Sequence, residues 1–439
     1  RHPRKPFEGH FSSGLFHQKK RLGPGLEPGK AHCGGLPSRP HFCGPIADWA
    51  GNYLSYPTEE NQSLMAGLYF HIPYCKQACS YCNFHFSVLR ERQGEMVEAL
   101  RREMFLRKEA LGGQALASIY LGGGTPSLLK PQELNLLLDT ALALFPAEAN
   151  LEITLEANPD DMERAYLREL RQSHVNRLSI GIQSFRDVDL QLMNRSHNAQ
   201  QAERAVKMAQ DEGFENLTVD LIYGLPELST AQWRSHLDQL RNWQVPHISA
   251  YALTVEPRTH LYHQIHTGEL AAPSDEVASA HFRELQDFAR TEGYRHYELS
   301  NLAQAGAEAR HNSSYWRGKA YLGIGPGAHS FLGSTRSWNV ANNALYLKAL
   351  AQNQRPAEEE HLSEREHYHE AVMTGLRLEE GLDLPKFRMG LSPELKRHFD
   401  TESRRLAERG RLHLSSERCY VPDKQRFFTD GIAAELFYV

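Results

Sequence analysis

Cysteine is scarce in this sequence, and its scarcity excludes one class of protein. Only six of the 439 residues are cysteine, too few for the disulfide framework that small secreted domains need. Three of them, Cys75, Cys79 and Cys82, lie in a single stretch, "HIPYCKQACSYCNFHF". Clustered thiols in a chain of this length indicate an intracellular protein that uses thiolates as ligands or nucleophiles, and we expect it in the cytoplasm.

Long apolar runs and an excess of positive charge are also missing. No stretch approaches the roughly 18 to 20 apolar residues that a transmembrane helix requires. The formal net charge is -5, whereas binding to nucleic acid needs clustered Lys and Arg against the phosphates. We therefore expect no transmembrane segment and no nucleic-acid partner.

Residues 1–64 lack the periodicity of helices or strands and are rich in Gly and Pro, as in "RLGPGLEPGKAHCGGLPSRP". Such a segment cannot bury enough apolar surface to order itself. Patterned sequence begins abruptly at Met65, with "MAGLYFHIPYC". We expect residues 1–64 to be a disordered leader or a mis-assigned start, with Met65 as the natural first residue, and we assign no role to Cys33 or Cys43.

From Leu68 onward one unit repeats: a short apolar strand, a loop and an amphipathic helix. Strands are predicted in "GLYFHIP", "SIYLGG", "NLEITLEANP", "RLSIGIQSF", "LTVDLIYGLP" and "HISAYALTVEP". They recur every roughly 30 to 50 residues, as in βαβ units, and several are apolar on both faces, as buried parallel strands are. Six units predict an α/β fold, a closed or partial (β/α)6 TIM-like barrel over residues 65–300, with its chemistry at the C-terminal ends of the strands.

Two further regions follow the barrel. Residues 301–357, which carry "HNSSYW" and "YLGIGPGAHSF", are predicted to be a sheet extension and linker. From about Glu358 the chain becomes helical and charged, so we expect residues 358–439 to form a mainly helical, winged-helix-like domain. The mixed charge there gives no support for DNA binding.

The cysteine loop has three interpretations from its residues alone. Cys75, Cys79, Cys82 and His85 could bind structural zinc as Cys3His, although all four crowd one short turn. Cys79 and Cys82 form a C-x2-C redox pair, which leaves Cys75 unexplained. An iron–sulfur cluster is normally held by four thiolates, and three thiolates leave one iron with an open position for chemistry.

The C-x3-C-x2-C spacing in a strand-to-helix loop, preceded by "YFHIP", resembles the signature of the radical S-adenosylmethionine (SAM) family. In that family, three cysteines hold a [4Fe-4S] cluster whose open iron chelates SAM. An electron from the cluster cleaves the sulfonium to a 5′-deoxyadenosyl radical. The resemblance therefore implies the cluster and SAM as cofactors and an electron donor as a partner.

Further motifs narrow the resemblance. "YLGGGTPSLL", "EANP", "GIQSF", "NRSH" and "DLIYGLP" follow in the order found in the subfamily of oxygen-independent coproporphyrinogen III oxidase and the heme chaperone HemW, and the likeness covers residues 65–439. It implies that SAM is bound by Tyr69, Gly124, Thr125, Pro126, Glu156, Gln183, Arg195 and Asp220. Glycine lets the backbone approach a ligand, and an arginine suits a carboxylate. The alternative for each residue is a surface salt bridge or a strand-end hydrogen bond.

Phe84 separates the two members of that subfamily. The oxidases resemble C-x3-C-x2-C-x-C, whereas the HemW type has phenylalanine at the last position, as here. "HNSSYW" matches the H-N-x-x-Y-W segment associated with HemW, which makes His311 a candidate axial ligand of heme iron. The alternative for this segment is a buried, hydrogen-bonded corner.

The resemblance thus implies a heme chaperone that binds heme, a [4Fe-4S] cluster and SAM, and delivers heme to respiratory heme proteins. The second hypothesis is an oxygen-independent coproporphyrinogen III oxidase, which oxidatively decarboxylates two propionates of its substrate. The third is a zinc-bound structural or interaction protein. Whether the protein is an enzyme stays open at this point.

Overall fold

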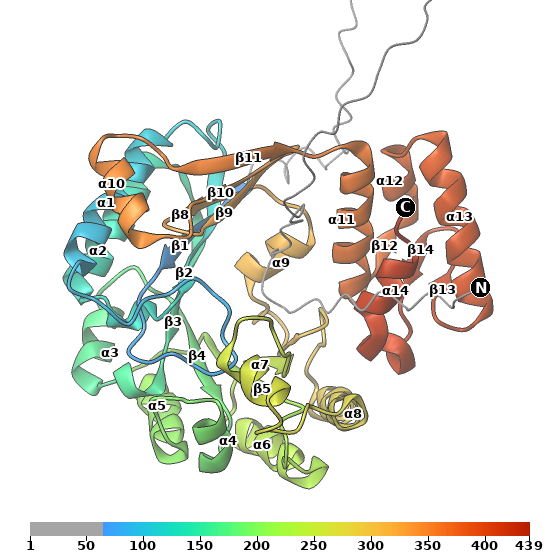
Figure 1. The fold of residues 1–439 in the computed structure, drawn as a ribbon, viewed down its shortest axis with the longest axis horizontal. Helices are drawn as coiled ribbons and strands as arrows, with labels where there is room; N and C mark the ends of the chain where they lie inside the picture. The colour runs from blue at the N-terminus through green and yellow to red at the C-terminus, as the bar shows by residue number, and fades with distance from the viewer. Residues whose placement is uncertain (1–64) are drawn as a thin grey trace, which may run out of the picture.

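The computed structural model describes residues 65–439. The expectations for residues 1–64, including those for Cys33 and Cys43, lie outside the described residues. Figure 1 shows an α/β body built on one large twisted sheet, with a smaller helical region beside it that ends at the C-terminus. No helix among residues 65–439 combines the length and the apolar character needed to cross a bilayer.

Six parallel strands form the centre of the sheet. They are β1 (Met65–Ile72), β2 (Ala115–Gly123), β3 (Ala147–Ala157), β4 (Arg177–Gln183), β5 (Leu217–Tyr223) and β6 (His247–Ala252). Each pairs in parallel with the next. In the described chain β1 takes β8 as its other neighbour and β6 takes β7. The barrel is therefore open, and the predicted α/β fold with a partial barrel is confirmed.

Helices connect these strands and cover the outer face of the sheet (Figure 1). They are α1 (Gln93–Leu106), α2 (Pro131–Leu144), α3 (Arg164–Arg171), α4 (Asp187–Leu192), α5 (Ala199–Asp211) and α6 (Thr230–Asn242), with short 3-10 helices η1 (Pro126–Leu128) and η2 (Pro159–Asp161). Helices α7 (His260–His266) and α8 (Asp275–Glu292) follow β6. Local signals set their ends: Asn198 caps α5 through a hydrogen bond from the Gln201 N–H, and Gly293 ends α8 in the left-handed conformation.

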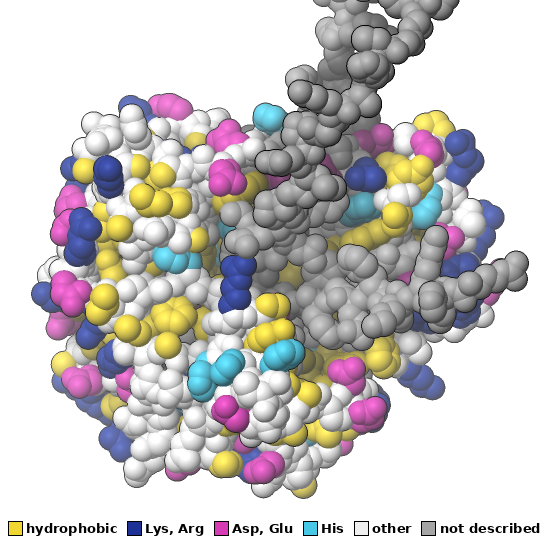
Figure 2. Space-filling view, in the orientation of Figure 1, with side chains coloured by type: hydrophobic (Ala, Val, Ile, Leu, Met, Phe, Trp, Pro, Cys, Tyr) yellow, Lys and Arg dark blue, Asp and Glu magenta, His cyan; other side chains and the backbone are white. Residues whose placement is uncertain are grey.

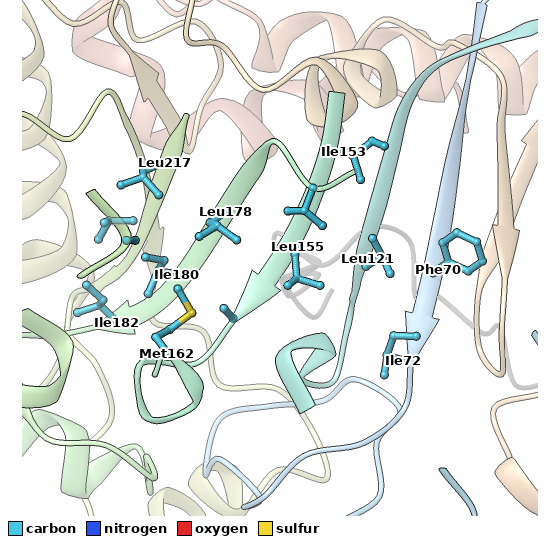
Figure 3. Packing of buried hydrophobic residues seen from close by; sticks show 14 of the residues in the cluster. Phe70, Ile72, Leu121, Ile153, Leu155, Met162, Leu178, Ile180, Ile182 and Leu217 are labelled. Atoms are coloured by element: carbon cyan, nitrogen blue, oxygen red, sulfur yellow. The ribbon is translucent and has the colours of Figure 1, made fainter. Parts of the chain in front are cut away.

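The main hydrophobic core lies between the sheet and these helices. Figure 3 shows side chains from neighbouring strands, such as Phe70, Leu121, Leu155 and Ile180, packed side by side. Strand β4 illustrates the pattern, since every residue except its glycine and its last residue is buried. Strands buried on both faces require near-continuous apolar sequence, which is why the six could be found from sequence.

Four more strands extend the sheet beyond β1. They are β8 (Tyr321–Ile324), β9 (His329–Leu332), β10 (Thr335–Asn339) and β11 (Ala357–His361), and β7 (Asn301–Ala303) closes the opposite edge. Helices α9 (Arg310–Trp316) and α10 (Asn343–Ala351) belong to the same region. Strand β11 is part of the sheet up to His361, so the expectation that the chain turns helical near Glu358 is wrong. Its sequence, "AEEEH", is poor in strand-forming residues and suits an exposed, charged edge.

A buried carboxylate fastens this extension to the barrel. Glu103 of α1 is fully buried and accepts hydrogen bonds from the Gly325 N–H at 2.9 Å, the Tyr346 hydroxyl at 2.6 Å and the Asn339 amide at 2.7 Å. Arg107 lies 3.3 Å from the same carboxylate. A buried charge with this many donors is satisfied, and removing one partner would leave it unpaired at considerable cost.

The C-terminal region has a hydrophobic cluster of its own. Its elements are α11 (Glu364–Arg377), β12 (Leu382–Asp383), α12 (Leu384–Met389), α13 (Pro393–Glu408), β13 (His413–Leu414), β14 (Arg418–Tyr420), η3 (Asp423–Phe428) and α14 (Thr429–Glu435). Strands β12, β14 and β13 form a small antiparallel sheet. The order of helix, strand, two helices and hairpin is that of a winged-helix module. Figure 2 shows Lys and Arg interspersed with Asp and Glu on the face in view.

Candidate cluster and cofactor site

A cavity of about 380 Å³ opens at the carboxyl ends of the parallel strands. Every predicted site residue except one lines it: Tyr69, Cys75, Cys79, Cys82, Gly124, Thr125, Glu156, Gln183, Arg195, Asp220 and His311. The exception is Pro126, which is buried as the first residue of η1. The fold thus brings together residues as far apart in the sequence as Tyr69 and His311. The volume of the cavity lies in the range that is usual for small-molecule binding sites.

The cysteine loop follows β1 and is held by backbone hydrogen bonds to other parts of the barrel. The Cys75 N–H donates to the Ser87 carbonyl at 3.0 Å, which closes the base of the loop. Ser80 donates its N–H to the Met193 carbonyl at 3.0 Å and accepts from the Leu261 N–H at 2.8 Å. The loop is therefore anchored to the segment after α4 and to the start of α7.

The three thiols of this loop face a common space. Cys75, Cys79 and Cys82 are free and half-buried. Burial raises the pKa of the Cys75 thiol, and it raises that of Cys82 to about 12. Without a bound cation these two sulfurs would stay protonated, whereas coordination to iron deprotonates a thiol outright. Three soft thiolates on one short loop fit the donor set of an iron–sulfur cluster.

The geometry is less suited to zinc. Among residues 65–439, no three Cys, His, Asp or Glu side chains converge closely enough to hold a single metal ion. His85, the fourth ligand in the Cys3His interpretation, places its Nε2 at 2.7 Å from Asn343 Oδ1. A cubane cluster takes each thiolate on a different iron, so its ligands stand further apart than those around one ion.

The glycine-rich turn after β2 packs directly against the start of the cysteine loop. The Gly124 N–H donates to the Ile72 carbonyl at 2.9 Å, and a Cβ on Gly124 would lie 2.6 Å from the Tyr74 carbonyl oxygen. Gly123 has φ +102° and lies against the His71 ring. Only glycine tolerates both the approach and the dihedral angle. The Thr125 N–H donates to the Tyr74 carbonyl at 2.7 Å, so the two loops form one unit.

Two half-buried carboxylates, Glu156 of β3 and Asp220 of β5, face the cavity. Glu156 accepts from the Tyr120 hydroxyl at 2.7 Å and from the Gly123 N–H at 3.2 Å. Asp220 accepts from the Ser179 hydroxyl at 3.2 Å. Burial raises the pKa of Glu156 to about 7 and that of Asp220 to about 6. A ligand with hydroxyl groups or a positive charge would relieve the cost of ionising them.

Arg195 supplies the positive charge of the site. Its Nη1 donates to Cys79 Sγ at 3.3 Å, and its Nη2 donates to Asn158 Oδ1 at 2.8 Å and the Gly181 carbonyl at 2.7 Å. Its Nε is buried and has no hydrogen-bond partner in the structure. An unused buried donor beside the cysteine loop fits a ligand that carries an acceptor, such as a carboxylate.

Gln183 ends β4 with a strained backbone. Its φ is +70°, a left-handed value that costs a residue with a side chain about 1 kcal/mol or more. The β4–β5 register shifts at the same place, between Gly181 and Gln183. The left-handed conformation of Gln183 changes the direction of the chain at the end of β4, where Gln183 lines the cavity.

His311 lies on α9, the helix formed by "RHNSSYW". Its Nδ1 is 2.8 Å from the Ser118 hydroxyl and its Nε2 is 2.8 Å from the Tyr315 hydroxyl. The ring is 2% exposed and stacks on Tyr120 at 5.0 Å between centroids. Burial lowers the pKa of His311 to about 3, so the imidazole is neutral. Both ring nitrogens of His311 therefore take part in hydrogen bonds. This is the arrangement expected if the HNSSYW segment is a buried, hydrogen-bonded corner, which was the alternative to a heme ligand.

Sequence reasoning missed several residues of the cavity wall, among them Tyr120, Asn158, Tyr251 and Glu298. Tyr120 and Asn158 lie inside motifs that were recognised, "YLGGG" and "EANP", and their neighbours could have pointed to them. Tyr251 lies at the C-terminal end of the predicted strand "HISAYALTVEP", where the chemistry was expected, whereas Glu298 has no such signal because it reaches the cavity only through the folding of the segment before β7.

The sequence is similar to those of known proteins. The sequence profile of the radical SAM superfamily matches residues 69–240, and that of the HemN C-terminal domain matches residues 362–428. The heme chaperone HemW of Bacillus subtilis is 32% identical over 360 residues, which cover 81% of this chain and 95% of that protein. This chain belongs to the HemW family of radical SAM proteins. The HemW of Mycobacterium tuberculosis is 34% identical over 375 residues, covering 84% of this chain and 94% of the relative.

A solved structure supports the fold. It is the Escherichia coli coproporphyrinogen III oxidase HemN, described as a radical SAM enzyme. The TM-score is 0.72 at 22% sequence identity, and the match covers 88% of this chain and 96% of HemN. Both the open barrel and the C-terminal region are thus part of a known architecture.

Membership in the radical SAM superfamily implies a [4Fe-4S] cluster and SAM. Bound at this loop, the cluster would supply the electron that cleaves the sulfonium of SAM. The chain's own contribution is binding and orientation. Cys75, Cys79 and Cys82 offer the thiolates, and the two cavity carboxylates and Arg195 offer partners for the hydroxyl, amine and carboxylate groups of SAM.

Proposed function

We propose that this protein is a heme chaperone: it binds heme beside its cluster and SAM, and it delivers the heme to respiratory heme proteins. One observation carries the proposal. Helix α9 contributes His311, Tyr315 and Trp316 to the same cavity that the three cysteines line. Cargo and cofactors would therefore share one chamber, and relatives that match over most of the chain are described as heme chaperones.

The SAM site is assigned to Tyr69, Gly124, Thr125, Glu156, Gln183, Arg195 and Asp220, with Pro126 shaping the turn beneath them. We assign His311 as the axial ligand of the heme iron. Coordination through Nε2 requires the ring to exchange its hydrogen bond with Tyr315 for a bond to iron, and Ser118 would keep the tautomer fixed. Tyr315 and Trp316 then offer aromatic surfaces to the macrocycle.

The test begins with anaerobic reconstitution of the cluster, followed by heme titration monitored by absorption. The wild-type protein should hold iron and sulfide, and it should develop a stoichiometric Soret band. Cys79→Ala should lose the cluster, because two thiolates hold a cubane poorly. His311→Ala should bind heme more weakly, whereas the exposed His361→Ala, on the edge strand β11, should bind like wild type.

Other outcomes would point elsewhere. Zinc in place of iron would indicate a structural metal protein. Oxidative decarboxylation of coproporphyrinogen III without heme binding would indicate an oxidase. Transfer is tested by mixing the heme-loaded protein with a heme-free respiratory hemoprotein and following the Soret band of the recipient; retention of all heme by the donor would contradict delivery.

A further inference from the structure

The short turn η2, directly after β3, carries two adjacent aspartates that tie the site loops together. Asp160 accepts from the Ser196 hydroxyl at 2.9 Å, and Asp161 accepts from the Ser127 hydroxyl at 2.7 Å. Ser127 belongs to the glycine-rich turn after β2, and Ser196 belongs to the segment after α4. Each aspartate therefore holds one of the loops that surround the cavity.

A single lysine from the cysteine loop joins both aspartates. Lys76 Nζ lies 2.9 Å from Asp160 Oδ2, and it also forms an ion pair with Asp161. Lys76 follows Cys75 directly in the sequence, so this contact fixes the backbone at the first cysteine. The lysine side chain is 35% exposed, whereas those of Asp160 and Asp161 are 11% and 4% exposed.

The positive charge of Lys76 balances the negative charges of Asp160 and Asp161. Asp160 and Asp161 are neighbours on one turn and both are largely removed from water, so their negative charges repel at short range. Lys76 is the cation that balances them. Without it, the two carboxylates would separate or take up protons, and the hydroxyls of Ser127 and Ser196 would lose their anchors.

The far side of the cysteine loop has a second anchor. Gln77 Nε2 donates to Asn194 Oδ1 at 2.8 Å, and Asn194 Nδ2 donates to the Ala78 carbonyl at 2.7 Å. Both anchors lie between the first and second cysteines. The three residues between Cys75 and Cys79 are thus all held in place: Lys76 by its ion pairs, and Gln77 and Ala78 by their hydrogen bonds with Asn194.

We propose that Lys76 and the Asp160–Asp161 pair form a clamp that positions the cysteine loop for the cluster and makes the cluster resistant to loss of iron. The clamp lines an open groove of about 320 Å³ behind the loop, so solvent and chelators reach the loop from this side. The inference rests on the cluster that the proposed function requires.

The experiment uses the full chain with its cluster reconstituted anaerobically. Iron and sulfide per chain are measured after desalting, and the loss of cluster absorption is followed after a ferrous-iron chelator is added. Lys76→Met should lose its cluster roughly two to five times faster than wild type, as expected for the loss of partly exposed ion pairs. Lys76→Arg should restore most of the lifetime. Lys130→Met is the matched control, because Lys130 is exposed and lines the same groove.

Each alternative gives a different pattern. Equal lifetimes for Lys76→Met, Lys130→Met and wild type would overturn the clamp. A lower melting temperature of the cluster-free chain with an unchanged chelation rate would show a purely structural ion pair and would also overturn it. Asp161→Asn provides a second route if Lys76→Met does not fold, and it should shorten the lifetime likewise. Wild-type protein that takes up no iron would refute the cluster itself, a failure distinct from that of the clamp.

Discussion

The Nε2 atom of His311 lies 2.8 Å from the hydroxyl of Tyr315, one helical turn further along α9. The spacing of "HNSSYW" creates this contact, because residues four apart share a face of a helix. The Ser118 hydroxyl engages the other ring nitrogen at 2.8 Å. The motif therefore joins α9 to β2 through a buried network.

This network should contribute to stability in the absence of any ligand. His311→Phe keeps the stacking on Tyr120 but leaves the hydroxyls of Ser118 and Tyr315 without their partner. We expect the free energy of unfolding to fall by about 1–3 kcal/mol, the cost of buried unsatisfied polar groups. Urea unfolding of the ligand-free protein measures this, and a variant as stable as wild type would show that the network contributes nothing.

Stability should decrease as the pH rises through the range in which Glu156 ionises. Its pKa is about 7 in the folded protein against 4.5 for the free group, so between these values the folded state binds more protons than the unfolded state. Stability is then higher near pH 5 and is lost toward pH 8. Glu156→Gln should reduce this loss by about 1–3 kcal/mol.

Urea unfolding at pH 5 and pH 8, without ligand, measures the effect. Asp220 has a raised pKa for the same reason, so part of the pH dependence should remain in Glu156→Gln. Glu109→Gln, at an exposed position in the turn after α1, is the control and should leave the pH dependence unchanged. An identical loss in Glu156→Gln and wild type would contradict the prediction.

The strain at Gln183 should be measurable as well. Gln183→Gly should stabilise the ligand-free protein relative to Gln183→Ala by about 1 kcal/mol, because alanine keeps the positive φ cost and glycine does not. Both variants should bind SAM more weakly than wild type, since both lack the side chain at the cavity wall. Calorimetric unfolding and SAM titration separate the two effects. Equal stability of the Gly and Ala variants would show that the φ of +70° is not strained.

Arg377 is one of several residues through which the C-terminal region contacts the rest of the described chain. Its guanidinium lies 4.6 Å from the centroid of the Trp316 ring, and its Nη1 donates to Asp430 at 2.7 Å. Arg377→Leu should lower the free energy of unfolding by about 2 kcal/mol, through loss of the cation–π contact and of a mostly buried ion pair. It should also shift the tryptophan fluorescence, because Trp316 loses its neighbour.

Arg388 offers the comparison for this variant. It pairs with Asp400 at 2.6 Å, but both side chains are one-third exposed. Arg388→Leu should therefore cost less than about 1 kcal/mol. If the two variants were equally destabilised, the contact with Trp316 would carry no energy of its own.

How much could be read from the sequence depended on burial. Several of the six barrel strands are near-continuous apolar runs because both of their faces are covered, and all six were predicted. Strand β11 was not, because a charged edge strand has no apolar signature. The HNSSYW segment was recognised as a motif, but its helical form was not predicted, and one of the two hydrogen bonds of His311 is to Ser118, which lies far away in the sequence.

The same division applies to the site. Motifs at strand ends could be assigned to one cavity because parallel strands end on one side of a sheet. Glu298 and the Asp160–Asp161 pair could not be assigned, since Glu298 reaches the cavity only in the folded chain and the two aspartates are joined by the distant Lys76. The sequence motifs therefore locate the candidate ligand residues, whereas the contacts that fix their positions appear only in the folded structure.

The pairing of β1 with β8 sets an order in which the molecule can be completed. Strand β1 is synthesised first among the described residues, and its second neighbour, β8, follows only at Tyr321. His85, just after the third cysteine, forms its hydrogen bond with Asn343, a residue that is synthesised later still. While the chain is on the ribosome, one edge of β1 is an unpaired template for wrong partners. The cysteine loop therefore reaches its final setting only after Asn343 has been made.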